Sequence, residues 1–268
     1  MMSSVHSPLL ISIPHCSTHI PPQIRQQMTF TDHHLKEETD LLTDQIFTLK
    51  NIPVLKASVS RYVVDLNRAR ESQGEKGVLV TTDFDNRPIY QSGFSISPQE
   101  KEHRLLQYWD PYHQDLTQQL RAPHISLFLD CHSMRPVGSR KAPDPGEERA
   151  DIVLSNLGTS TGKTRPEIGY LSCQWEWLLK VAEILEVLWR PHPIDIAFND
   201  PYYGGYITEH YSHPDWQGHK QGFQIEINRK LYLNWDTQES LPHKVLQLNQ
   251  IFQEFLERVQ RLLLKPSL

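Results

Sequence analysis

The sequence predicts an α/β fold in which helices cover both faces of a mostly parallel sheet. Short apolar runs with strand character alternate along the chain with longer segments whose apolar residues recur at helical spacing. Strands separated by helices are typical of βαβ units, whose strands run parallel. A chain of 268 residues is long enough to bury a sizeable core, and we interpret residues 1–268 as one α/β domain.

In the first half of the chain, aliphatic residues fill 9–13, as in a short buried strand, and recur at helical spacing over 40–49. The segments 54–59 and 61–66 are apolar, the second is rich in Val and Tyr, and both are expected to be strands. The amphipathic segment 99–120 predicts a long helix, because a Ser-Pro pair directly before it is a helix start signal.

In the second half, the apolar run 125–129 is expected to be a buried strand, and 152–154 a further one. A broad apolar face over 174–189 predicts a helix, which is followed by a strand at 222–228 and a closing amphipathic helix at 242–264. Long loops, rich in Pro, Gly or charged residues, are expected over 135–149 and 199–222.

Composition and charge exclude several classes of function. The formal net charge is −5 and no basic cluster is present, so nucleic acids and anionic membranes, which need a cationic surface, are poor partners. No apolar run approaches the ~20 residues of a membrane span, and no signal peptide is recognised. Three cysteines are too few, and odd in number, for a disulfide framework. We therefore expect a cytoplasmic protein, with its oligomeric state left open.

Two histidines follow predicted strands: His15 comes after 9–13, and His132 after 125–129. Ligand sites of open α/β sheets lie beyond the carboxyl ends of the strands, so both histidines are expected at one edge. Two histidines and a carboxylate form the ligand set of a catalytic zinc ion that keeps one position open for water. Asp130 points the same way as His132 and is expected to orient a histidine. The sequence therefore predicts a zinc site, although iron, cobalt and nickel suit the same ligands.

The pattern alone does not decide which carboxylate completes this site. The candidates are Glu37, Glu38, Asp40 and Asp44, with His19 as a nitrogen alternative. Acidic residues in this segment are also typical of a solvated helix start, where they interact favourably with the helix dipole.

Glu226 is the candidate for proton transfer. It lies in an otherwise apolar strand, where desolvation raises the pKa of a carboxylic acid toward neutrality. A carboxylate of this kind is suited to take a proton from water and pass it to the departing nitrogen of an amide. The alternative is a structural glutamate that faces solvent from an edge strand.

Substrate-binding side chains are expected after the predicted strand 61–66. Arg68 is suited to bidentate capture of a carboxylate, and Asn67 beside it to donation to a carbonyl or carboxylate oxygen. Arg61 is a further substrate-binding candidate. The alternative is that Asp65 forms a structural ion pair with Arg68 or with Arg61 and holds the loop.

Further candidates come from two predicted loops. Ser133 and Arg135 are possible donors to a second carboxylate of the substrate, although an exposed, uninvolved Arg135 is the alternative. The segment 199–222, with its Gly204-Gly205 pair, is expected to be a lid that excludes water. Within that segment, His210 is expected to orient substrate, to stabilise a tetrahedral oxyanion, or to be a third nitrogen near the metal.

Short motifs are spread over the chain from residue 9 to about 233, and they read LLISIPHCSTHIPP, EETD, SRYVVDLNR, NRPIY, PYHQDL, LFLDCHSMR, GGYITEHY and QIEINRKLYL. In their order and number they resemble the N-formylglutamate amidohydrolase (N-formylglutamate deformylase) family. The resemblance implies a three-layer α/β/α fold with a mixed, mostly parallel sheet, of the phosphorylase/hydrolase type found in zinc carboxypeptidases and aspartoacylase. It also implies zinc-dependent hydrolysis of a small anionic N-acyl amino acid, typically N-formyl-L-glutamate, to formate and L-glutamate, as in histidine degradation.

By position, the resemblance assigns His15 and His132 as metal ligands and favours Asp40 as the carboxylate ligand. It also places Glu226 where the wider fold has its catalytic glutamate.

Two other classes of function remain open. One is a cysteine-dependent amidase that uses Cys16 or Cys131 with a histidine base. Cys131 and His132 are adjacent on an extended segment and face opposite sides, so of the two only Cys16 is able to pair with His132. The other class is a non-catalytic protein that binds carboxylates or metal.

Overall fold

The computed structural model describes residues 7–264, and its main sheet has six strands in the order β2-β1-β3-β6-β4-β5. The strands are β1 (Leu9–Ile13), β2 (Val54–Lys56), β3 (Leu127–Met134), β4 (Ile152–Ser155), β5 (Ile196–Phe198) and β6 (Gln221–Asn228). The first four in the spatial order run parallel, β4 is antiparallel to β6, and β5 is parallel to β4. The predicted mixed, mostly parallel sheet is confirmed.

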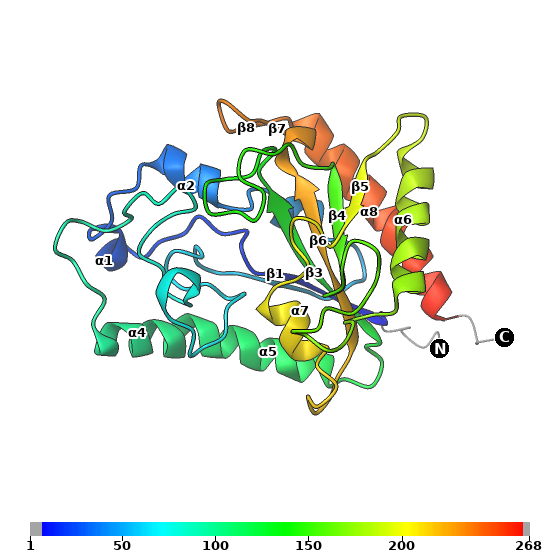
Figure 1. Ribbon diagram of the computed structural model, residues 1–268, viewed down its shortest axis with the longest axis horizontal. Coiled ribbons are helices and arrows are strands. Elements are labelled where there is room, and N and C mark those ends of the chain that lie inside the picture. Colours follow the sequence, from blue (N-terminus) through cyan, green and yellow to red (C-terminus); the bar gives the residue numbers. More distant parts are fainter. Residues whose placement is uncertain (1–6, 265–268) are drawn as a thin grey trace.

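Helices cover both faces of this sheet and complete a three-layer α/β/α arrangement (Figure 1). One face is covered by α3 (Thr43–Ile46), α6 (Trp175–Trp189) and α8 (Pro242–Leu263). The other is covered by α5 (Asp110–Leu120) and α7 (Tyr206–Tyr211), and a π-helical segment (Leu105–Trp109) joins α5 to α4 (Pro98–Arg104), which extends beyond the sheet. Outside these layers lie α1 (Pro22–Arg25), α2 (Asp32–Glu38), two 3₁₀ turns (Gly74–Lys76 and Arg229–Leu231) and a hairpin of β7 (Leu233–Asn234) and β8 (Glu239–Ser240).

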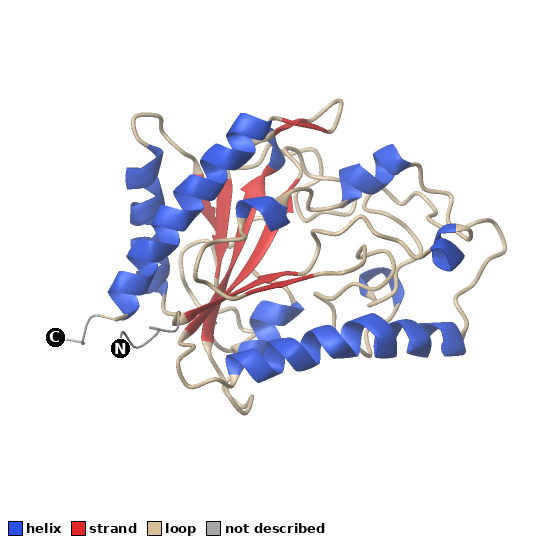
Figure 2. Cartoon of the chain, turned by 180° about the vertical axis from the view of Figure 1, so that it is seen from behind, coloured by secondary structure: helices blue, strands red, loops and turns tan. Residues whose placement is uncertain are grey.

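The long helix predicted over 99–120 is confirmed, and it appears as one continuous rod from α4 to α5 (Figure 2). The Ser97 side chain caps its start by accepting a hydrogen bond from the backbone N–H of Glu100 at 3.1 Å. Pro111 lies inside the rod, where it has no N–H to donate and its ring crowds the carbonyl four residues earlier. The π-helical segment directly before it widens the helix at the point where this crowding has to be relieved.

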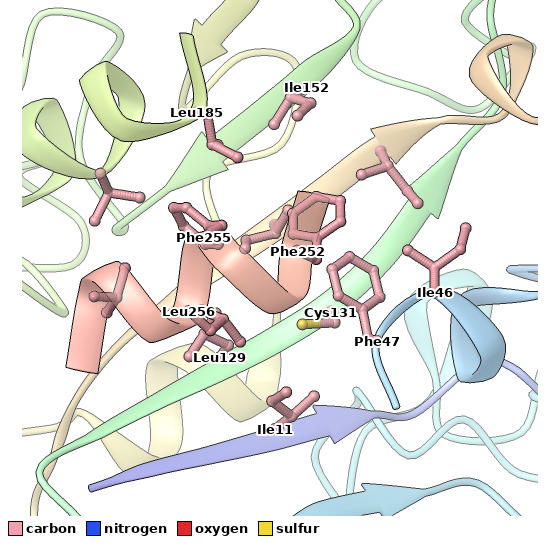
Figure 3. Packing of buried hydrophobic residues seen from close by; sticks show 14 of the residues in the cluster. Ile11, Ile46, Phe47, Leu129, Cys131, Ile152, Leu185, Phe252, Phe255 and Leu256 are labelled. Carbon is pink, nitrogen blue, oxygen red and sulfur yellow. The ribbon is translucent and has the colours of Figure 1, made fainter. Parts of the chain in front are cut away.

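Side chains of the central strands alternate between the two faces of the sheet. On the side of α3, α6 and α8 they are apolar and form a dry core, which Figure 3 shows around Ile11, Phe47, Leu129, Cys131 and Phe252. On the opposite side, toward the carboxyl ends of the strands, the alternate positions are polar and are occupied by Ser12, Asp130, His132, Gln224 and Glu226. The same alternation that builds the core therefore aligns a row of polar groups on the face of α5 and α7.

Several predicted elements need correction. The strand predicted over 61–66 is wrong, because this segment forms turns whose apolar side chains pack against α4 and α5 without joining the sheet. The strand predicted over 54–59 ends at Lys56, while the one predicted over 125–129 continues to Met134. The helix predicted over 40–49 is reduced to α3, because Leu42 takes a left-handed conformation with φ 63° and interrupts it.

Other elements were not expected from the sequence. These are α1, α2, β5 and α7, the last of which lies inside the segment predicted as a long loop. The acidic segment 36–40, for which a helix start was the alternative to metal binding, covers the end of α2 and the residues that follow it. Within residues 7–264, the search for a helix of sufficient length and hydropathy to cross a membrane finds none.

Candidate active site

A pocket of about 130 Å³ lies at the carboxyl ends of β1, β3 and β6. It brings together most of the candidate metal-ligating, catalytic and substrate-binding side chains, namely His15, Glu38, Asp40, Arg61, Asn67, Arg68, His132, Ser133, Arg135 and Glu226. These residues come from segments that are far apart in the sequence. They meet because parallel strands present their carboxyl ends at one edge of a sheet.

His15, Asp40 and His132 form a buried cluster inside this pocket. The Oδ2 atom of Asp40 lies 3.1 Å from Nδ1 of His132 and 3.7 Å from Nδ1 of His15. The two imidazole rings are 4.9 Å apart between centroids. Burial favours the neutral acid, but hydrogen bonds and charge from the two histidines outweigh it and lower the pKa of Asp40.

Each imidazole of this cluster is held from behind by a second buried carboxylate. Nε2 of His15 donates to Asp65 at 2.7 Å, and Nε2 of His132 lies 3.1 Å from Asp130. A carboxylate only accepts hydrogen bonds, so each one favours a proton on the Nε2 atom that it faces. The Nδ1 atoms of both histidines then face the Asp40 carboxylate.

Two imidazole nitrogens and a carboxylate oxygen that face one another in a buried space are compatible only with a cation between them, which is a proton on the imidazole in the metal-free protein or a bound metal ion. The donor set of two imidazole nitrogens and one carboxylate oxygen fits zinc or a similar divalent transition metal. Carboxylates behind the ligating imidazoles are the usual support for such a site. The residues present therefore fit a metal ion with His15, Asp40 and His132 as its protein ligands.

Local structure explains how these ligands reach one place. His15 lies just beyond the end of β1, where Pro14 stops the strand, and its carbonyl accepts a hydrogen bond from the backbone N–H of Asp40 at 3.1 Å. Asp40 follows the end of α2 after the extended residue Thr39, so its side chain is free of helical constraint. His132 lies inside β3, because that strand runs on past its apolar part.

The other carboxylate candidates lie elsewhere or are already paired. Glu38 is buried and accepts from Tyr62 and Arg135, and Glu37 faces Arg87 at 3.6 Å. Neither Asp44 nor His19 lines the pocket, and His19 is exposed to solvent.

Glu226 lies on β6 directly opposite His132 on β3 in the parallel register. It is buried, and its Oε1 accepts a hydrogen bond from Nε2 of Gln224 at 2.9 Å. Burial raises the pKa of Glu226 to about 7, while the nearby imidazole of His132 opposes the rise. The alternative of a solvent-facing edge glutamate is wrong, because β6 lies inside the sheet between β3 and β4.

The arginines of the pocket differ in how far they are already neutralised. Arg61 donates to Asp65 at 2.6 Å, as in the structural ion pair considered above. Arg135 is partly buried and donates to Glu38 and to Asp85, so the interpretation of Arg135 as a free surface residue is wrong. Arg68 has a half-exposed side chain and only a distant contact, 4.0 Å, with Asp65. Of these three, Arg68 is the most available to a ligand.

Asn67 connects the pocket to α7. Its Nδ2 donates to Asp130 at 3.1 Å, and its Oδ1 accepts from the backbone N–H of Ile207 at 2.7 Å. Gly205 lies so close that an added Cβ would meet the Asn67 amide at 2.2 Å. The glycine predicted to act as a hinge thus provides space for this close approach.

His210 and Ser133 have contrasting positions. The hydroxyl-bearing Ser133 is buried and lines the pocket. His210 lies on α7, stacks on Tyr206 with 5.0 Å between ring centroids, and lines a separate groove with Trp109 and His113. The helical turn of α7 directs Ile207 and Thr208 inward and leaves His210 on another side, so the structure does not bring His210 to the metal-ligand cluster.

The cysteines considered for a thiol mechanism lie outside the pocket. Cys131 belongs to the apolar core (Figure 3), and burial raises its pKa well above the ordinary value. Burial, assisted by the Asp44 charge, raises the pKa of Cys16 to about 12. A reactive cysteine needs a lowered pKa, so neither thiol has the environment of a nucleophile.

The pocket also contains residues that sequence reasoning missed: Arg149, Tyr202, Gln224 and Arg229. For Arg229 a signal was present, because it directly follows the β6 strand that carries Glu226. Its position at a strand end meets the same criterion that identified His15. Arg149 and Tyr202 lie in long loops, whose course the sequence does not predict.

Comparison with known proteins places the chain in a family. The model of the N-formylglutamate amidohydrolase family matches residues 7–233. Curated relatives include N-formylglutamate deformylases of Pseudomonas aeruginosa, 29% identical over 245 residues that cover 85% of this chain and 82% of the relative, and of Pseudomonas putida, 27% identical with 84% and 82% covered. A solved N-formylglutamate amidohydrolase structure from Ralstonia eutropha has a TM-score of 0.70 at 22% identity, covering 95% of this chain and 94% of that one. The chain belongs to the N-formylglutamate amidohydrolase family.

Proposed function

We propose that this protein is a metal-dependent hydrolase that cleaves N-formyl-L-glutamate to formate and L-glutamate. The observation that carries the proposal is the pair of histidine Nδ1 atoms that face Asp40, each imidazole backed by a buried carboxylate, with Glu226 in the same pocket. The printed names of the two Pseudomonas relatives support N-formylglutamate as the substrate.

The metal and its ligands have distinct roles in this proposal. A zinc ion held by His15, Asp40 and His132 would polarise the formyl carbonyl and would lower the pKa of a bound water molecule to about 7. Asp65 and Asp130 keep the imidazoles in the required tautomer and orientation. Asn67 positions Asp130, because its amide donates to that carboxylate.

Glu226 handles the proton. Its carboxylate accepts a proton from the attacking water and transfers it to the departing amino nitrogen, which would otherwise be a poor leaving group. The raised pKa suits this role, because a base that titrates near the working pH is able to both accept and return a proton. The α-carboxylate of the substrate is assigned to Arg68, whose planar guanidinium suits a bidentate contact.

The proposal is tested with protein stripped by a chelator and reloaded with zinc, iron, cobalt or nickel. Formate release from N-formyl-L-glutamate is measured beside acetate release from N-acetyl-L-glutamate and hydrolysis of N-carbamoyl-L-glutamate. We expect turnover only after reloading, with the formyl substrate preferred. Tight glutamate binding without turnover of any of the three substrates would instead identify a binding protein. Activity that survives the chelator and is abolished by a thiol alkylator would identify a cysteine amidase.

A further inference from the structure

Arg229 is a buried cation that forms no ion pair with any carboxylate of residues 7–264. It lies at the end of β6, lines the pocket beside the metal-ligand cluster, and is only 3% exposed. Nη1 donates to the backbone carbonyls of Glu37 at 2.7 Å and Thr39 at 3.0 Å, at the end of α2. Within residues 7–264, no Asp or Glu oxygen lies within the 4.0 Å of an ion pair with its guanidinium.

Such a group is costly to keep in a folded protein. A guanidinium stays charged at any ordinary pH, and an unpaired charge in a desolvated site destabilises the folded state. Burial lowers the pKa of Arg229, the charge of Arg135 acts in the same direction, and the more distant charges of Asp40 and Glu38 only partly offset them. Its Nε is also buried without a hydrogen-bond partner among the described residues. The carbonyl contacts therefore satisfy only part of its donors.

A second guanidinium lies in the same part of the pocket. The two terminal nitrogens of Arg135 donate to Glu38 and Asp85, but its Nε, like that of Arg229, is buried and finds no partner in the described part of the chain. Both guanidiniums pack against the ring of Trp235, at 5.1 Å for Arg229 and 5.9 Å for Arg135 from the ring centroid. Glu38 and Asp85 already pair with Arg135, but its charge still opposes that of Arg229, and the unsatisfied donor left to each guanidinium is its Nε.

We propose that Arg229, with Arg135 beside it, binds the side-chain carboxylate of an acidic N-acyl amino acid and so selects glutamate over neutral residues. The inference rests on the proposed function and adds to it the origin of substrate selectivity. Two N–H groups without acceptors and one unneutralised charge are the features that a carboxylate would satisfy. Arg68 remains assigned to the α-carboxylate.

The competing explanation is that Arg229 only caps α2 and keeps Asp40 in place. The two explanations differ in selectivity. A displaced Asp40 lowers turnover of every substrate by the same factor, whereas a lost carboxylate subsite affects only the substrate that carries the charge. The relevant measurement is therefore the ratio of kcat/KM for N-formyl-L-glutamate to that for N-formyl-L-glutamine, whose side chain has nearly the same shape without the charge.

Arg229→Gln is the decisive variant, because it keeps a polar amide and carries no charge. The amide is too short to reach the carbonyls that Nη1 contacts, but the loss of those contacts affects both substrates equally and cancels in the ratio. We expect kcat/KM for the glutamate substrate to fall roughly 10²- to 10³-fold, as when one partner of a buried charge pair is removed. The ratio should fall to near 1, with metal content unchanged by elemental analysis. Arg140→Gln removes the same charge from an exposed position and should leave the ratio as in the wild type.

An equal loss with both substrates, or loss of bound metal, would assign Arg229 to the helix cap and overturn the proposal. If Arg229→Gln does not fold, the variants Arg229→Lys and Arg135→Gln decide. Each should lower the ratio of kcat/KM for the glutamate substrate to that for the glutamine substrate about tenfold or more. A wild-type ratio in both variants would refute the subsite. Calorimetry with glutarate and its monoamide separates the two proposals. A wild-type protein that prefers glutarate but hydrolyses no N-acyl amino acid would refute the activity and retain the subsite.

Discussion

Replacing Glu226 with Gln removes a buried ionisable group with almost no change in shape. The Gln side chain is still able to accept the hydrogen bond from Gln224, which is 2.9 Å from Oε1 of the native glutamate. What the variant cannot do is ionise. It therefore separates the cost of a buried carboxylate charge from the packing and hydrogen bonding of the side chain.

The size of the effect follows from the pKa. Burial raises the pKa of Glu226 from 4.5 to about 7, and each unit corresponds to 1.36 kcal/mol, so the ionised form costs the metal-free fold about 3 kcal/mol. Between pH 4.5 and about 7 the folded state retains a proton that the unfolded chain releases. The contribution of the neutral acid is thus fully present below pH 4.5 and is lost as the pH rises through 7.

We therefore expect metal-stripped Glu226→Gln to match the wild type in free energy of unfolding near pH 4.5 and to exceed it by up to about 3 kcal/mol at pH 8. Urea unfolding at the two pH values gives both numbers. Glu147→Gln is the matched control, because Glu147 is exposed and its replacement should leave the pH dependence unchanged. A variant that is equally or less stable than the wild type at pH 8 would refute the raised pKa.

The same variant tests catalysis when metal is present. Glu226→Gln should retain metal while kcat falls roughly 10²- to 10⁴-fold, the usual contribution of a general base. An unchanged kcat would mean that another group accepts the proton.

The other predictions concern the ligands, the substrate clamp and the core. His132→Ala should lose both metal and activity, and full metal occupancy by elemental analysis would contradict its role as a ligand. Asp65→Asn removes the carboxylate behind His15 and should weaken metal affinity about 10- to 100-fold in a chelator competition, whereas unchanged affinity would make that contact incidental. Arg68→Ala should lower kcat/KM by a factor that corresponds to about 2 kcal/mol of transition-state stabilisation. This is the lower end for a charged contact, because the Arg68 side chain is half exposed. Arg68→Lys should raise KM. An α-amide substrate turned over as well as the acid would refute this clamp. Phe252→Ala should destabilise the core by about 3–5 kcal/mol in urea unfolding with kcat unchanged, since Phe252 is fully buried far from the polar face of the sheet; a loss of kcat in folded protein would count against that separation.

The sequence by itself determined the α/β class, the helices over 99–120, 174–189 and 242–264, and the strand end that carries His15. These features depend on local periodicity, start signals and strand length, which a single chain segment contains in full. The family motifs then implied a metal cluster with Asp40, and the structure brings that residue to His15 and His132.

Only the tertiary structure decided how polar groups are distributed over the site. The turns at 61–66 have the composition of a strand, but their apolar side chains are buried by helix packing, which sequence periodicity does not distinguish from a sheet. Arg135 and Arg229 likewise look alike in sequence, since both follow strands that end at the pocket. Whether a buried arginine is neutralised depends on acids brought close by the fold: Glu38 and Asp85 reach Arg135, whereas the hydrogen bonds of Arg229 within residues 7–264 go to backbone carbonyls.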